Sequence, residues 1–233
     1  MEVEVAGIKK AYPKKTVLRE ASFSVRAGNC VGILGSNGSG KSTLLSILAG
    51  VRKADGGSFY MRDEENPAHS ARVVDLLHCR KALSKALGYV PQGDPLMEEL
   101  NAWDNLRMWH DRETLKQSLA GGALRMLGIG EFLKTPVRRM SGGMKKRLSI
   151  GCAVVSDPAI LLLDEPSAAL DPVCKENIRA YLATYKKSGG IILMVTHDAQ
   201  DLELCDACYI LKDGVLQTYD YDGDFHRLAG ALL

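Results

Sequence analysis

The chain alternates between short apolar runs and longer amphipathic stretches, which predicts strands that alternate with helices. Polar and apolar side chains alternate at residues 2–8 and 17–25, as expected of two antiparallel strands that each bury one face. Continuous apolar runs at 30–34, 160–163 and 191–195 predict buried strands. Because buried strands separated by helices are typical of parallel sheets, we expect a largely parallel sheet with helices on both faces.

Periodicity and turn residues predict the remaining elements. Helices are expected at 41–49, 73–83, 102–109, 113–127, 143–155, 172–187 and 198–204. Shorter strands are expected from residue 56 onward, at 88–90, and at 207–211 and 215–219, the last two joined by the turn dipeptide Asp213-Gly214. Residues 94–157 are mostly helical and interrupt the alternation, so they predict an inserted helical subdomain.

The composition excludes several classes of protein. Hydrophobic residues make up 46% and charged residues 25% of the 233 residues, which is typical of a globular chain and too apolar for a disordered one. No apolar run approaches the roughly 18 residues of a membrane-spanning helix, so no direct membrane span is expected. The 30 basic and 28 acidic side chains give a net charge of +2, and we expect no nucleic-acid partner from so balanced a chain.

The cysteines and the first residues indicate the compartment. Six cysteines are dispersed along the chain, which begins MEVE. A start with neither a basic nor a long apolar segment predicts no secretory signal, and dispersed thiols fit a reducing cytoplasm. Only Cys205 and Cys208 form a CxxC pair. Since no second pair follows, we interpret them as small apolar side chains rather than zinc ligands.

A glycine-rich loop follows the first buried strand and precedes a helix. It matches the pattern GxxxxGK[ST], and the residues from its first glycine onward are Gly35, Ser36, Asn37, Gly38, Ser39, Gly40, Lys41, Ser42 and Thr43. Glycines allow successive backbone N–H groups to converge on phosphate oxygens, and the helix N-terminus adds a positive dipole. Lys41 can then reach the β- and γ-phosphates, and the Ser42 hydroxyl can bind Mg²⁺. A chance glycine turn would not need this strand–loop–helix context.

Two acidic residues end the second buried strand. Asp164 and Glu165 directly follow the run of leucines at 161–163. Because successive side chains of a strand point to opposite faces, the two carboxylates can take different roles. We expect Asp164 to bind Mg²⁺ and Glu165 to act as general base toward the attacking water.

A second anion site is predicted within the helical insert. Ser141, Gly142 and Gly143 offer a hydroxyl and exposed backbone amides at a helix N-terminus, followed by the basic residues of 145–147. The loop of the same chain already surrounds its own γ-phosphate, so this second site is expected to serve a nucleotide held by another subunit. We interpret 145–147 as a solvated helix face rather than a nucleic-acid site.

At this point the sequence resembles the ATP-binding subunits of ABC transporters over nearly its whole length. The family signature LSGGQ reads MSGGM at 140–144. The resemblance implies an α/β fold, the P-loop NTPase fold of ABC ATPases, with a RecA-like core, an antiparallel β subdomain and an inserted α-helical subdomain. It implies one domain, 1–233, with the core and β subdomain at about 1–93 and 158–233 and the helical subdomain at about 94–157.

The resemblance also implies roles for single residues. Tyr12 matches the aromatic residue that stacks on adenine, and Gln92 matches the glutamine that links the Mg²⁺ site to the helical subdomain. Asp171 ends the loop AALD, which many members begin with serine, and His197 matches the histidine that contacts the γ-phosphate. The implied catalytic set is Glu165, His197, Gln92 and Lys41, and the implied metal ligands are Ser42, Gln92 and Asp164.

Each of these residues also has a purely structural interpretation. Tyr12 can be a strand-end aromatic, Gln92 a surface loop residue, His197 a neighbour of a helix cap, and Asp171 the cap of the helix that follows it. Two departures from the family pattern stand out. Met144 replaces glutamine, and residues 61–88 are longer than the usual connection, with no functional explanation.

The family mechanism that the resemblance implies needs partners. Two ATPase subunits, identical or different, would pack head to tail with ATP and Mg²⁺ between the loop of one and residues 141–143 of the other. A separate integral membrane permease would dock near residues 94–110 and hold the chain at the cytoplasmic face of the membrane. The residues MKKR at 144–147 and LMEEL at 96–100 are similar to ABC-2-type exporters.

Three alternatives remain open from the sequence. The chain can be an importer subunit, a soluble ABC ATPase that acts on ribosomes or DNA, or a small-molecule phosphotransferase. The last would need an acceptor pocket and would not need residues 141–143.

Overall fold

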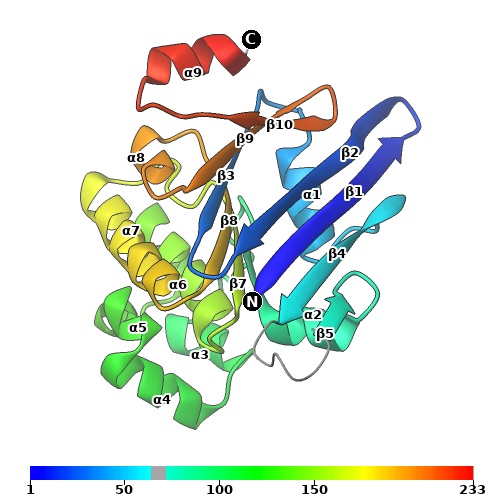
Figure 1. The fold of residues 1–233 in the computed structure, drawn as a ribbon. Coiled ribbons are helices and arrows are strands. Elements are labelled where there is room, and N and C mark those ends of the chain that lie inside the picture. The colour runs from blue at the N-terminus through cyan, green and yellow to red at the C-terminus, as the bar shows by residue number, and fades with distance from the viewer. Residues whose placement is uncertain (64–71, 233) are drawn as a thin grey trace.

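The computed structural model describes residues 1–63 and 72–232 of the chain (Figure 1). In this part of the chain, ten strands form one continuous sheet in the order β5-β4-β1-β2-β10-β9-β3-β8-β7-β6. The strands β9, β3, β8, β7 and β6 are parallel to one another, and the strands at the other end of the sheet pair antiparallel. The expected parallel sheet is therefore formed by these five strands, and the sheet as a whole is mixed.

The parallel strands are buried on both faces, which explains their unbroken apolar runs. Every residue is buried in β3 (Cys30–Leu34), β7 (Ile160–Asp164) and β8 (Ile191–Val195). Within β7, Leu161 packs into one core cluster and Leu162 into the other, as the two-residue period of a strand requires. The strands β6 (Leu87–Val90) and β9 (Ala207–Lys212) flank this group.

The antiparallel part of the sheet contains the N-terminal hairpin. The strands β1 (Glu2–Tyr12) and β2 (Lys15–Arg26) pair with each other, and β4 (Gly56–Asp63) pairs with β1. At the other end of the chain, β10 (Val215–Tyr219) forms the expected hairpin with β9. Asp213 and Gly214 both have positive φ, as that turn requires. The helix α1 (Lys41–Leu48) packs its apolar side chains into the core under this part of the sheet.

The sequence-based prediction of one helix over 73–83 is wrong. The structure has the strand β5 (Arg72–Asp75) and then the helix α2 (Arg80–Ala86). Val73 and Val74 pair with β4, because β-branched residues suit a strand edge that already has a partner. The segment 61–88, which looks long for the family, includes residues 64–71, and these lie outside the described residues.

Most helices lie together on one side of the central sheet, at the lower left of Figure 1. They are α3 (Ala102–Arg107), α4 (Arg112–Gly121), α5 (Ala123–Met126), the 3₁₀ turns η1 (Ile129–Phe132) and η2 (Val137–Arg139), and α6 (Gly142–Val154). The predicted helix 113–127 is divided at Gly122, where the backbone is extended and the Ser118 hydroxyl accepts from the Leu124 amide.

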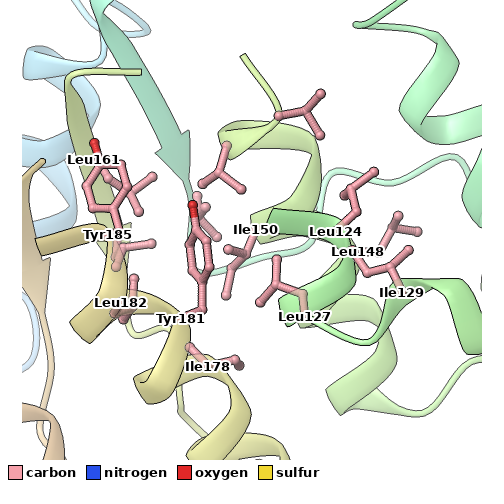
Figure 2. Close-up of a cluster of buried hydrophobic side chains, with 14 of the residues drawn as sticks. Leu124, Leu127, Ile129, Leu148, Ile150, Leu161, Ile178, Tyr181, Leu182 and Tyr185 are labelled. Carbon is pink, nitrogen blue, oxygen red and sulfur yellow. The ribbon is translucent and has the colours of Figure 1, made fainter. Parts of the chain in front are cut away.

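One apolar cluster joins these helices to the sheet through α7 (Pro172–Lys187), which has its expected bounds. In Figure 2, Leu127 and Ile150 lie next to Tyr181, and Leu161 lies beside Tyr185. The Tyr185 hydroxyl donates to the Pro158 carbonyl over 2.7 Å, so this buried phenol is paired. The cluster therefore fixes the helical segment against the strand that carries the two acids.

Two short helices complete the fold. The helix α8 (Ala199–Leu202) follows β8, and α9 (Phe225–Leu232) covers a small cluster behind β3 that contains Leu34, Cys208 and Leu228. The helix α9 was not expected from the sequence. Within residues 1–63 and 72–232, none of the helices has both the length and the apolar character that crossing a membrane requires.

We expect Leu161→Ala to lower the free energy of unfolding by about 2–5 kcal/mol, because it leaves a cavity at the centre of the larger cluster. Urea denaturation followed by circular dichroism measures the change. Val173→Ala is the control, since Val173 is 71% exposed on α7 and its truncation should change stability by less than about 0.5 kcal/mol. Equal losses in the two variants would contradict the assignment of the core.

Candidate functional site

The glycine-rich loop connects β3 to α1 and is shaped by its close neighbours. Gly40 precedes the helix with φ 115°, and a Cβ there would lie 2.5 Å from Val17 Cγ1 on β2. Gly35 has φ 151°, and a Cβ there would lie 2.7 Å from the Leu211 carbonyl oxygen. Only glycine fits both positions. The loop is thus held against two neighbouring strands, while Asn37 at its middle is exposed.

The Lys41 side chain is buried beneath this loop. Its Nζ donates to the carbonyl oxygens of Gly35 over 2.7 Å and of Ser36 over 3.1 Å. Burial lowers the pKa of Lys41, and the nearby carboxylates of Glu165 and Asp164 act in the opposite direction. Within the part of the chain that the structure describes, the hydrogen bonds of this ammonium group go to backbone carbonyls, which a stronger anion can replace.

Asp164 ends β7 close to the first turn of α1. Its side chain is 2% exposed, and burial raises the pKa of Asp164, while a hydrogen bond from the Ser42 hydroxyl lowers it. Among the described residues, Asp164 Oδ1 has no hydrogen-bond partner. A buried carboxylate oxygen without a partner, beside a serine hydroxyl, is a donor set that suits Mg²⁺.

Glu165 stands next to two of the predicted catalytic residues. Its Oε2 accepts a hydrogen bond from Gln92 Nε2 over 3.1 Å, and its Oε1 lies 3.9 Å from His197 Nε2. Glu165 has φ 52°, an unusual value for a side-chain-bearing residue, and its amide donates to the Val195 carbonyl over 2.8 Å. Glu165 and His197 share the lining of a cavity of about 220 Å³.

The electrostatics of His197 favour its neutral form. Burial lowers the pKa of His197, the Lys41 charge lowers it further, and Glu165 raises it. The lowered pKa favours the neutral imidazole at pH 7, and this form can donate one hydrogen bond toward the cavity.

A buried network holds the segments of Glu165 and His197 from behind. Asp201 on α8 accepts from Thr196 Oγ1 over 2.9 Å and also pairs with the Ser167 hydroxyl. Arg179 Nε on α7 donates to the same carboxylate over 2.8 Å. Sequence reasoning missed Asp201 and Arg179, because a charged residue in a helix ordinarily faces water. Their sequence signal is weak: each lies in a helix that follows a predicted site residue, Asp171 before α7 and His197 before α8.

The predicted second anion site lies at the N-terminus of α6. The Ser141 hydroxyl accepts from the Met144 amide over 3.2 Å and caps the helix, and Ser141 and Gly142 are exposed. Asp171 caps α7 in the same way and accepts from the Cys174 amide over 2.9 Å. A Cβ at Gly143 would lie 2.8 Å from Cys174 Sγ, so the two helix N-termini pack closely.

Tyr12 stands at the end of β1, beside the loop. It is 37% exposed, its hydroxyl accepts from Arg52 Nη1 over 3.0 Å, and the Lys10 ammonium lies 5.7 Å from its ring centroid. On the same hairpin, Lys15 Nζ donates to the Gly38 carbonyl over 3.0 Å. The aromatic ring is thus carried by a hairpin that is tied to the loop.

The structure brings together part of the predicted set. Lys41, Asp164, Glu165, Gln92 and His197 meet at the carboxyl ends of the parallel strands, and the loop residues surround them. Residues 141–143 and Asp171 lie instead on two other helix N-termini. Between described residues, no hydrogen bond or ion pair connects them to the loop.

Two interpretations from the sequence have clear outcomes in the structure. The residues 145–147 are not a solvated face: Lys146 is 4% exposed, and Arg147 donates to the Leu127 carbonyl over 3.2 Å. Helix packing, which a linear basic run does not reveal, buries Lys146 and half-buries Arg147. Cys205 and Cys208 are free thiols, and the described residues contain no group of three metal-ligating side chains near them.

A glycine-rich GxxxxGK[ST] loop follows the buried parallel strand β3, and the strand that ends in the two acids, β7, lies two positions away in the same parallel sheet, with β8 between them. This combination defines the P-loop class of nucleotide-binding folds. The sequence matches the family described as ABC transporter over residues 18–168. The chain therefore belongs to the ABC transporter family, and the resemblance and fold class predicted from the sequence are confirmed.

Curated relatives and a solved structure agree with this assignment. The chain is 34% identical to the Nod factor export ATP-binding protein I of Ralstonia nicotianae over 91% of its own length and 64% of that protein. It is 29% identical to the lantibiotic transport ATP-binding protein SrtF of Streptococcus pyogenes, over 95% of its own length and 92% of that protein. The ATP-binding cassette MJ0796, in a dimeric post-hydrolysis state bound to ADP and Pi, superposes with a TM-score of 0.78 and 25% identity, over 94% of this chain and 98% of that one.

We expect the charges around His197 to move its pKa in opposite directions. Lys41→Met should raise the pKa, because it removes a nearby positive charge, and Glu165→Gln should lower it, because it removes a negative one. An NMR titration of the imidazole resonances in the nucleotide-free protein measures both shifts. Lys187→Met, on the exposed end of α7, should leave the pKa unchanged. Shifts of the same sign in the first two variants would contradict the geometry.

Proposed function

We propose that this chain binds and hydrolyses ATP as the motor subunit of an ABC exporter. The observation that carries the proposal is the convergence of Lys41, Asp164 and Glu165 at one end of the parallel sheet. A cation under a loop of amides suits the phosphates, and the two acids supply a metal ligand and a base. This combination serves phosphoryl transfer to water.

The residues of the loop take distinct roles in this proposal. The amides of residues 35–43 hold the phosphate oxygens, and Lys41 exchanges its carbonyl partners for the β- and γ-phosphates. Ser42, Asp164 and Gln92 would hold Mg²⁺, which when bound neutralises charge on the phosphates. The ring of Tyr12 would stack on adenine, on the hairpin that Lys15 ties to the loop.

The chemical step is assigned to Glu165 and His197. Glu165 accepts the proton of the attacking water, and Gln92 orients its carboxylate through the 3.1 Å hydrogen bond. His197, whose lowered pKa favours the neutral ring, donates a hydrogen bond to the γ-phosphate rather than adding a charge. Both residues line the same cavity, so a water and a terminal phosphate can meet there.

We propose that each ATP is bound between two subunits packed head to tail. Ser141 and Gly142 are exposed at the N-terminus of a thirteen-residue helix, which is a favourable position for a phosphate from outside the chain. Asp171, at the neighbouring N-terminus, would lie at the same interface. The dimeric state of MJ0796 with ADP and Pi supports this arrangement. ATP then favours the closed dimer because it binds that state more tightly than the open one.

A separate membrane permease is the second proposed partner. A groove of about 980 Å³ runs between the loop of Gln92 and the helices, and it is lined by Val51, Leu96 and Trp109 among others. Trp109 is 69% exposed, which is unusual for so large an aromatic side chain. The names of the relatives, Nod factor export and lantibiotic transport ATP-binding proteins, support an exporter at the cytoplasmic face of the membrane.

The division of the domain into parts is also a proposal. Residues 94–157 would form a helical subdomain, and 1–93 and 158–233 the core with its β subdomain. The change from sheet to helices after β6 and the return to sheet at β7 support these boundaries.

We expect Glu165→Gln to lower kcat for ATP hydrolysis at least about 100-fold, because it removes the base while keeping the shape of the side chain. Calorimetry should show that ATP affinity is kept, and gel filtration with ATP should show a stable dimer. Glu176→Gln, at an exposed position of α7, is the control. Turnover at the wild-type rate in Glu165→Gln would remove Glu165 from the chemical step.

We expect the tagged chain to copurify, in detergent, with a membrane protein encoded beside it. Trp109→Ala should weaken this association, since it removes the largest exposed side chain of the groove, and Val173→Ala should not. Quantitative mass spectrometry of the captured proteins measures both. Copurification with ribosomes, unaffected by Trp109→Ala, would favour a soluble ABC ATPase instead.

A further inference from the structure

Lys146 is a buried lysine of α6 that belongs to neither the glycine-rich loop nor residues 140–144 of the signature. Its ammonium group is buried and lies 3.0 Å from Asp94 Oδ1. It also donates to the carbonyl oxygens of Gln92 over 3.2 Å and of Pro91 over 3.4 Å. All three acceptors belong to the short segment 91–94, so one side chain holds the whole loop.

The loop that Lys146 holds is the one that carries Gln92. The backbone of Gln92 is bound by Lys146, and its side chain donates to Glu165 over 3.1 Å. Lys146 lies little more than one helical turn after Ser141, on the same helix. The helix α6, which begins at residues 141–143, is therefore connected to Glu165 by two hydrogen bonds in series, Lys146 to the Gln92 carbonyl and the Gln92 side chain to Glu165.

The burial of Lys146 distinguishes it from its neighbours. Lys145 pairs with Glu98 over 3.3 Å, and Arg138 pairs with Glu99 over 3.4 Å, but the glutamates of both pairs are mostly exposed. Exposed pairs contribute little, whereas a buried ammonium is costly unless its hydrogen bonds are well made. The buried charge of Lys146 is matched by three oxygen acceptors, and all three belong to the 91–94 loop.

We propose that Lys146 is a positioning residue that fixes the 91–94 loop and so keeps Gln92 on Glu165 when α6 is in place. The inference rests on the proposed function, since it assigns Gln92 and Glu165 to ATP hydrolysis. The loop residues also line the groove proposed for the permease, so Lys146 connects the groove, the signature helix and the carboxylate. Movement of α6 relative to the core would then reach Glu165 through the side chains of Lys146 and Gln92.

The test compares Lys146→Met, Lys146→Arg and Lys145→Met in the full chain. Hydrogen exchange of the nucleotide-free protein reports on the amides of residues 92–94, and steady-state kinetics gives kcat and KM for MgATP. We expect Lys146→Met to raise exchange in the loop and to lower kcat at least about tenfold, with KM changed by less than about twofold. Lys146→Arg should restore part of the protection from exchange and part of kcat, and Lys145→Met should match the wild type in both measurements.

Two results would overturn the inference: exchange in Lys146→Met equal to that in Lys145→Met, or a kcat loss matched by an equal loss of ATP affinity. If Lys146→Met fails to fold, Asp94→Asn removes the charged acceptor alone. Hydrogen exchange of the loop and kcat then test the positioning role in that variant. Absence of hydrolysis by the wild type would contradict the proposed function, while the exchange difference would still support the positioning role.

Discussion

The arrangement of this chain depends on a buried cation at the carboxyl end of a parallel sheet. The ammonium group of Lys41 lies beneath the loop that positions it, paired with the backbone carbonyls of Gly35 and Ser36. A buried charge is tolerated only when the surrounding groups are fixed, and here β3 and α1 fix them on both sides. Asp164, Glu165 and His197 also follow the carboxyl ends of parallel strands. Their two carboxylates and one imidazole therefore lie near the Lys41 ammonium group.

Two polar networks hold that edge from different directions. Asp201 and Arg179 tie the segments after β7 and β8 together, so Glu165 and His197 cannot shift independently. On the other side, the 91–94 loop connects Glu165 to α6 through Lys146. The apolar cluster between α7 and the helical segment holds the two networks at fixed positions relative to each other, because the same helices contribute to the cluster and to the site (Figure 2).

Sequence and structure agree best where the chemistry is local. The glycine loop and the pair of acids could be predicted because their roles depend on neighbours in the chain, and the structure places them at the expected strand ends. The burial of Lys146 and the role of Asp201 could not, because both follow from the packing of distant helices. For the same reason, the sequence around Val73 and Val74 predicts a helix, whereas pairing with β4 makes these residues part of a strand. The catalytic and metal-binding roles of the site residues remain predictions.

The central proposal is that two ATPase subunits share each ATP, and complementation between two variants of this chain tests it most directly. Lys41→Ala removes the cation of one half of the proposed site, and Ser141→Arg blocks the other half. Each variant alone should hydrolyse ATP very slowly. A mixture should recover at least about tenfold more activity, because mixed dimers contain one intact loop facing one intact signature. A mixture no more active than its components would contradict the shared site.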